Sequence, residues 1–155
     1  DTATIAAAAT LSQIGKMYVP REIITKPGVL TDEEKRVMEQ HVEHTKNILS
    51  SIEFDLPVID AIEQMNERLD GKGYPLGLQG DEIKIYGRVL AVANAFTAMA
   101  RPRSYRPAMD AETVLQILEK EAGSYDQHIV QVLREVLASP AGERVVEIAA
   151  QSTAV

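Results

Sequence analysis

Two arginines on one short loop have the chemistry best suited to binding an anion. Arg103 and Arg106 lie in the segment RPRSYRP, which separates two helical patterns. Arginine presents a planar set of N–H donors that matches phosphate oxygens, so the pair could hold a phosphodiester. The alternative is a solvated basic loop that pairs with an acidic surface, and the residue types alone favour that alternative.

His41 is the histidine whose position invites a metal-binding interpretation. It lies on the apolar face of a predicted helix, beside Val37, Met38 and Val42. One histidine does not hold a metal, and a histidine in this position is typical of a hydrogen-bonded core residue. The chain has no cysteine, which excludes disulfides and thiolate chemistry.

A glycine-rich stretch, ERLDGKGYPLGLQG, separates two helical patterns between Glu67 and Gly80. Its Asp-Gly and Lys-Gly pairs are turn dipeptides, and its proline forces the preceding tyrosine into an extended conformation. Long ordered loops in compact domains are usually functional. We therefore predict a loop of fixed shape that contacts a partner. The residues expected at this contact are Asp70, Gly71, Gly73, Tyr74 and Pro75.

Composition limits the class of protein. A length of 155 residues fits a single domain covering residues 1–155, and no apolar run is long enough to span a membrane. The net charge of −7 argues against general nucleic-acid binding, but not against a small anionic ligand held by a few cations. The absence of cysteine fits a cytoplasmic protein. Because the sequence does not begin with methionine, we expect an N-terminally truncated fragment of a longer protein.

The spacing of apolar residues predicts an all-α fold of about six or seven helices. The segment Ile85–Ala100 is apolar almost all round, which is typical of a central, buried helix. Thr31 and Glu34 form a capping-box pattern that marks a helix start. We expect helices near residues 4–14, 31–52, 57–66, 85–100, 110–123 and 126–137, with residues 141–155 as a C-terminal extension helix.

The string DGKGYP, followed by LGLQGDEI and RVLAVANAF, resembles the HD-GYP family of bacterial phosphohydrolases, whose loop reads HHExxDGxGYP. The resemblance extends from about Leu11 to Leu137. It implies a helical bundle of the HD superfamily. It also implies a site with two or three iron or manganese ions, which activate a water for attack on the phosphodiester of cyclic di-GMP.

The resemblance further identifies the positions of the family's metal ligands. The matching residues here are Ser12, Gln13, His41, Met65, Asn66 and Asn94. Only His41 is a usual metal ligand among them, so we predict a degenerate domain with no metal cofactor and no catalytic residue. The expected function is a signalling or interaction module. The alternatives are a metal-dependent cyclic di-GMP phosphodiesterase and a structural spacer or dimerisation domain.

Binding residues are implied by the resemblance as well. The family's D-R-P-Y-R segment matches residues 102–106, so Arg103 and Arg106 are expected to contact the phosphates of cyclic di-GMP. Lys16 and Arg88 are further candidates, with a plain salt bridge as the alternative for either. The Gly-Tyr-Pro loop is expected to contact a diguanylate cyclase (GGDEF) domain. We expect neither a nucleic-acid partner nor a membrane segment.

Overall fold

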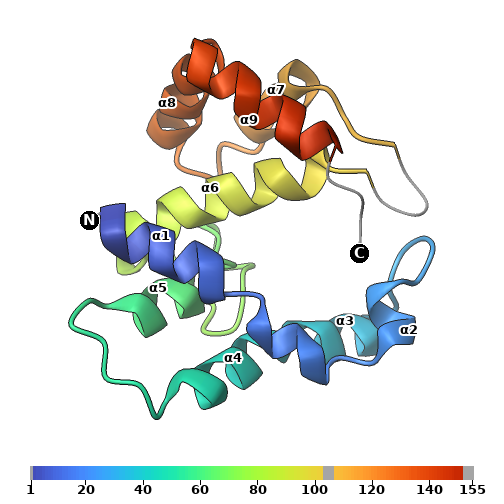
Figure 1. Cartoon of the computed structure of the whole chain (residues 1–155), viewed down its shortest axis with the longest axis vertical. Helices are drawn as coiled ribbons and strands as arrows, with labels where there is room; N and C mark the ends of the chain where they lie inside the picture. Colours follow the sequence, from blue (N-terminus) through green and yellow to red (C-terminus); the bar gives the residue numbers. More distant parts are fainter. Residues whose placement is uncertain (1, 103–106, 152–155) are drawn as a thin grey trace.

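The computed structural model describes residues 2–102 and 107–151, and within these ranges the chain folds into helices joined by loops (Figure 1). The predicted all-α fold is confirmed, since the pairing seen in this part of the chain is an isolated bridge between Asp70 and Gln79. The α-helices are α1 (Thr2–Leu11), α2 (Arg21–Ile24), α3 (Asp32–Glu39), α4 (His41–Leu49), α5 (Val58–Gln64), α6 (Ile85–Ala100), α7 (Ala111–Lys120), α8 (Gln127–Leu137) and α9 (Pro140–Gln151). The short 3-10 helices are η1 (Ile14–Tyr18) and η2 (Gly80–Glu82).

Helix α6 lies at the centre, as its apolar composition predicts. Figure 1 shows α1 and α5 on one side of it and α7, α8 and α9 on the other. Leu90 joins the core formed with α1, α4 and α5, whereas Phe96 and Ala100 join the core formed with α7 and α8. A single helix therefore links both hydrophobic cores and fixes the relative positions of the helices around it.

The close approach of α5 and α6 depends on Gly87. A Cβ atom at this position would lie 2.7 Å from Cβ of Gln64, so a larger residue would push the helices apart. The backbone N–H of Lys84 donates to Oε1 of Gln64 at 2.7 Å, which ties the start of α6 to the end of α5. This contact sets the distance between the residues that follow α5 and those in the middle of α6.

The first helix ends earlier than predicted. It stops at Leu11, and Gly15 lies inside η1 rather than ending the helix. Gly15 packs on α4: its N–H donates to Oγ1 of Thr45 at 3.0 Å, and a Cβ would lie 2.1 Å from the carbonyl oxygen of His41. The glycine is thus required by a tertiary contact, which its local sequence does not reveal.

The helix predicted over residues 31–52 is two helices, α3 and α4, which meet at Gln40. The capping box at its start is confirmed: the N–H of Glu34 donates to Thr31 Oγ1 at 3.2 Å, and Glu34 Oε2 accepts from the N–H of Thr31 at 2.8 Å. No glycine or proline marks the break, so the sequence carries no local signal for it.

Helices α7 and α8 begin near the predicted starts, and each has an aspartate as its N-cap. Asp110 accepts from the N–H of Thr113 at 2.9 Å, and Asp126 accepts from the N–H of His128 at 3.0 Å. Pro140 does not break the chain, because as the first residue of α9 its missing N–H removes no helical hydrogen bond. The last helix therefore begins at Pro140, one residue before the predicted start, and its described part ends at Gln151.

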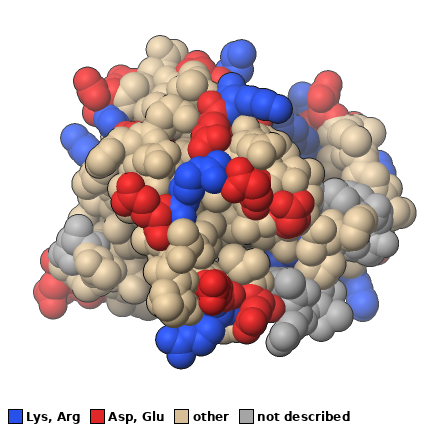
Figure 2. Space-filling model, turned by 90° about the horizontal axis from the view of Figure 1, so that it is seen from above, with Lys and Arg blue, Asp and Glu red and all other residues tan. Residues whose placement is uncertain are grey.

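Charge is mixed over the surface. On the face that Figure 2 shows, Lys and Arg side chains alternate with Asp and Glu, and no broad basic area is visible there. This distribution agrees with the net charge of −7. None of the helices in the two described ranges combines the length and the hydropathy that a bilayer crossing requires.

Candidate functional site

A cleft of about 250 Å³ lies where α3, the end of α5, the glycine-rich loop and α6 meet. Met65 and Asn66 follow α5, and Asn94 lies in the middle of α6. All three line the cleft, and all three are positions at which the resemblance implies metal ligands. The structure therefore brings Asn94 into one site with Met65 and Asn66, although Asn94 lies 28 residues after Asn66 in the sequence.

The two asparagines in the cleft contact each other. Nδ2 of Asn94 donates to Oδ1 of Asn66 at 3.2 Å. Nδ2 of Asn66 is buried and, within the part of the chain that the structure describes, has no hydrogen-bond partner. Met65 is buried in the core that α1, α5 and α6 share. The cleft thus offers two neutral amides with an unused donor.

The other matched positions lie on the η1 and α4 side. Ser12 is buried and its hydroxyl donates to the carbonyl of Ala9 at 3.1 Å, while Nε2 of Gln13 donates to Ser12 Oγ at 3.2 Å. His41 is buried, and its Nδ1–H donates to the carbonyl of Met38 at 2.8 Å. His41 therefore has the environment of a hydrogen-bonded core histidine.

Burial lowers the pKa of His41, the hydrogen bond to Met38 opposes this, and the positive charge of Lys16 lowers the pKa further. Lys16 directly follows Gly15, which packs against the backbone of His41. The ring of Tyr74 meets the ring of His41 edge to face, with centroids 6.3 Å apart. Because Tyr74 also lines the cleft, it connects the buried histidine to the cleft wall.

Glu67 holds the shape of the glycine-rich loop. Its side chain is almost fully buried, and its carboxylate accepts from the backbone N–H groups of Leu76, Gly77 and Leu78 at 2.7, 3.2 and 3.0 Å. This role of Glu67 was not predicted. The available signal was a carboxylate directly before a glycine-rich loop, whose backbone donors need an acceptor.

The residues predicted to form a contact surface lie together in this loop. Gly71 has a φ of +74°, which glycine adopts without strain, and Gly73 packs so closely that a Cβ would lie 2.4 Å from Cα of Glu67. Tyr74 is partly buried, and this burial, with the charge of Glu39, raises its pKa to about 12. The tyrosine is thus a neutral phenol at physiological pH.

A second set of bonds fixes the loop to the turn between α7 and α8. The N–H of Leu69 donates to the carbonyl of Ser124 at 2.9 Å, and the hydroxyl of Ser124 donates to Asp70 at 3.1 Å. The guanidinium of Arg68 pairs with Glu121 at 2.9 Å and lies 5.3 Å from the ring centroid of Tyr125. The loop is therefore held both by Glu67 and by the turn between α7 and α8.

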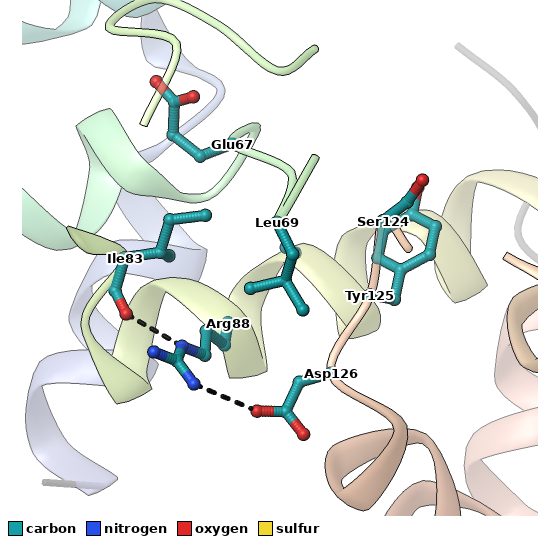
Figure 3. Close-up of a pocket in the computed structure, with 8 residues that line it drawn as sticks. Glu67, Leu69, Ile83, Arg88, Ser124, Tyr125 and Asp126 are labelled. Atoms are coloured by element: carbon teal, nitrogen blue, oxygen red, sulfur yellow. Dashed lines mark hydrogen bonds and ion pairs between the residues drawn. The ribbon is translucent and has the colours of Figure 1, made fainter. Parts of the chain in front are cut away.

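Arg88 is a structural residue in this arrangement. Figure 3 shows its guanidinium between the carbonyl of Ile83, 2.8 Å away, and the carboxylate of Asp126, 3.4 Å away. It also pairs with Asp81 at 3.0 Å. The cavity beside it measures only about 10 Å³, room for about one water. Of the alternatives considered for Arg88, the salt bridge is the one that the structure shows.

Two of the predicted phosphate-binding residues, Arg103 and Arg106, lie outside the described residues. Lys16 lies in η1. Across residues 2–102 and 107–151, no group of three or more His, Cys, Asp or Glu side chains is placed to hold a metal ion. The described side chains therefore do not fit a centre built from histidine and aspartate ligands.

Comparison with known proteins gives a consistent family result. A profile of the HD domain family matches residues 1–129. A cyclic di-GMP phosphodiesterase of Thermotoga maritima is 38% identical over 127 residues, which cover 80% of this chain and 34% of that protein. A 3′3′-cGAMP-specific phosphodiesterase of Vibrio cholerae is 37% identical over 113 residues, 73% of this chain and 25% of that protein.

A cyclic di-GMP phosphodiesterase response regulator of Xanthomonas campestris is 34% identical over 129 residues, 81% of this chain and 34% of that protein. The chain thus spans about a quarter to a third of the length of these relatives.

The family match contradicts the expectation that no metal cofactor is used, because HD-domain phosphodiesterases normally use metal ions. That expectation counted only the usual ligands at the matched positions. Hydroxyl and amide oxygens, such as those of Ser12, Asn66 and Asn94, also bind hard cations. The number of histidines and aspartates at the matched positions is therefore not sufficient to decide whether the protein uses a metal cofactor.

Proposed function

The chain belongs to the HD domain family, and on that basis we propose that it is a signalling domain that recognises a cyclic dinucleotide, with recognition rather than hydrolysis as its main role. Its relatives carry the names of cyclic di-GMP and 3′3′-cGAMP phosphodiesterases, so a ligand of this class is the natural candidate. Cyclic di-GMP is the ligand that we propose first.

The observation that carries the proposal is the pair of amides in the cleft. Asn66 and Asn94 occupy positions where the family's resemblance implies a histidine and an aspartate, and they bond to each other. An amide neither accepts nor releases a proton near neutral pH, so it offers hydrogen bonds rather than acid–base chemistry. Two amide side chains in the cleft therefore suit the binding of a ligand better than its hydrolysis.

Phosphate recognition is assigned in this proposal to Arg103 and Arg106, with Lys16 as a further cation. A charge-assisted hydrogen bond from an arginine to a phosphate oxygen is stronger than a neutral one, and two arginines on one loop can contact both oxygens of a diester. A few local cations are sufficient for such a ligand even though the chain is acidic overall.

The partner surface in this proposal is the Gly-Tyr-Pro loop. Its backbone is fixed by Glu67, while Leu76 remains 56% exposed. A rigid loop with an exposed apolar side chain binds a partner at low entropic cost. The partner that we propose is a diguanylate cyclase (GGDEF) domain, and the location is the cytoplasm.

Calorimetric titration with cyclic di-GMP at low salt tests the function. We expect saturable binding, and we expect Arg103→Ala and Arg106→Ala each to weaken it roughly tenfold or more. Arg144→Ala, which removes an exposed arginine from α9, is the matched control and is expected to change the affinity little. Absence of binding at millimolar ligand would leave a structural or partner-binding domain.

A further inference from the structure

We infer that Lys35, Lys72 and Asn66 form a phosphate subsite in the cleft, so that the ligand's phosphodiester is held there by ammonium and amide donors of this chain. This inference rests on the proposed function and deepens it, since it adds two lysines that the resemblance does not name and gives Asn66 a role in binding phosphate. The first support is location. Lys35 belongs to α3, Lys72 to the glycine-rich loop and Asn66 to the turn that follows α5, and all three line one cleft.

The second support is the unused donor on Asn66. Its Nδ2 is buried without a hydrogen-bond partner in the described part of the chain. Buried donors in folded proteins are nearly always paired, so an acceptor is expected at this point. Nε of Arg68, which lines the same cleft, also has no hydrogen bond among the described residues, but it lies 3.7 Å from a carboxylate oxygen of Asp70 and is therefore not unpaired in charge. A phosphodiester has only acceptor oxygens to offer, and therefore suits the unpaired donor of Asn66.

The third support is the state of the charges around the cleft. The carboxylate of Glu67 is already occupied, because it accepts three backbone hydrogen bonds. Glu39 approaches Lys35 only to 3.8 Å, and the side chain of Lys35 is 67% exposed. This separation exceeds that of a charge-assisted hydrogen bond, so the ammonium group keeps donors for a ligand.

The ammonium group of Lys72, like that of Lys35, keeps donors for a ligand. Asp70 accepts the backbone N–H of Lys72 at 3.0 Å, and the hydroxyl of Ser124 also donates to Asp70. Within the two described ranges, no hydrogen bond or ion pair is seen for the ammonium group of Lys72. Two cations from separate segments thus reach one cleft in a protein whose net charge is −7.

The size of the cleft limits what it can hold. A volume of about 250 Å³ is smaller than the ~300–1,000 Å³ of most small-molecule sites. It suits a phosphate and its immediate surroundings better than a whole cyclic dinucleotide. The cleft is therefore one subsite, and the rest of the ligand would lie beyond its walls.

The experiment compares single variants in a titration with cyclic di-GMP at low salt. Lys35→Gln and Lys72→Gln are each expected to weaken binding about fivefold, the scale of a partly exposed charge contact. Lys72→Arg keeps the charge and should bind like the wild type. Asn66→Asp adds a negative charge beside the phosphate and should weaken binding about tenfold or more. Lys120→Gln, at an exposed lysine of α7, is the matched control.

Salt dependence separates ligand contact from a structural effect. Each lysine that touches the phosphate should reduce the slope of log affinity against log salt when it is replaced, whereas a structural defect would lower the melting temperature of the free protein instead. If the wild type binds and both lysine variants bind as tightly as Lys120→Gln, the subsite is overturned and the proposed function stands. If the wild type does not bind cyclic di-GMP, the proposed function fails, and the subsite fails with it.

Discussion

Oε1 of Glu67 accepts a hydrogen bond from the backbone N–H of Leu76 at 2.7 Å, across the whole Gly-Tyr-Pro turn. The same carboxylate binds the N–H groups of Gly77 and Leu78. A buried carboxylate, rather than glycine content alone, therefore sets the shape of the loop. The charge is satisfied by backbone donors, which explains how it tolerates nearly complete burial.

Replacement of Glu67 by glutamine is expected to destabilise the protein. Glutamine has nearly the same shape, but its NH₂ group would face backbone N–H donors and leave part of them unpaired. We expect the free energy of unfolding to fall by about 2–4 kcal/mol, measured by urea denaturation. Glu53→Gln, at an exposed position, should stay within about 0.5 kcal/mol of the wild type.

Hydrogen exchange locates the effect of that change. In Glu67→Gln the amides of Leu76, Gly77 and Leu78 should exchange much faster than in the wild type, because their acceptor is lost. Unchanged protection of these three amides would show that the loop holds its shape without the carboxylate.

Gly73 is predicted to tolerate no side chain. A Cβ there would lie 2.4 Å from Cα of Glu67 and 2.5 Å from the backbone nitrogen of Arg68, atoms that cannot move independently. We expect Gly73→Ala to lower the free energy of unfolding by roughly 1–3 kcal/mol. Gly123→Ala is the control, since no atom lies within 4 Å of its added Cβ. Equal melting temperatures for the two variants would contradict this packing.

Asp70 should contribute stability that depends on pH. The N–H of Lys72, with a smaller contribution from the Ser124 hydroxyl, holds the pKa of Asp70 below its ordinary value of 3.8. A lowered pKa means that the stabilisation is present above the unfolded-state pKa and is lost as pH falls through the folded-state value. Asp70→Asn should therefore melt lower than the wild type at pH 7, and this difference should shrink below about pH 3.8.

Thermal unfolding of both proteins between pH 7 and pH 3 checks the prediction for Asp70. A difference that stays constant over this range would mean that the charge of Asp70 is not what stabilises the loop. Asp55→Asn provides a control on the loop before α5.

The parts of the fold that were predictable are those with local signals. Helix α6 is apolar almost all round, and Thr31, Asp110 and Asp126 are caps whose side chains bond to the next turn. The break at Gln40 was not predictable, because no glycine or proline marks it. The role of Gly15 was not predictable either, because it depends on contact with the carbonyl of His41 in α4, which is distant in the sequence.

The candidate site also has a part that was predictable from the sequence and a part that was not. The resemblance located the positions of Met65, Asn66 and Asn94, and the structure brings them to one cleft. The role of Glu67 was not predicted, because the three backbone N–H groups that it binds come together only in the folded loop. The prediction that no cofactor is used was wrong, because it treated missing histidines as missing metal chemistry.

The most direct test of the central claim is the fate of bound nucleotide. The protein would be incubated with equimolar cyclic di-GMP, with and without added manganese, and the bound fraction would be separated and analysed by chromatography. The Thermotoga maritima phosphodiesterase serves as the positive control for turnover. We predict that the nucleotide elutes with the protein and is recovered intact under both conditions. Recovery of the linear dinucleotide or GMP, or the absence of bound nucleotide, would contradict the account.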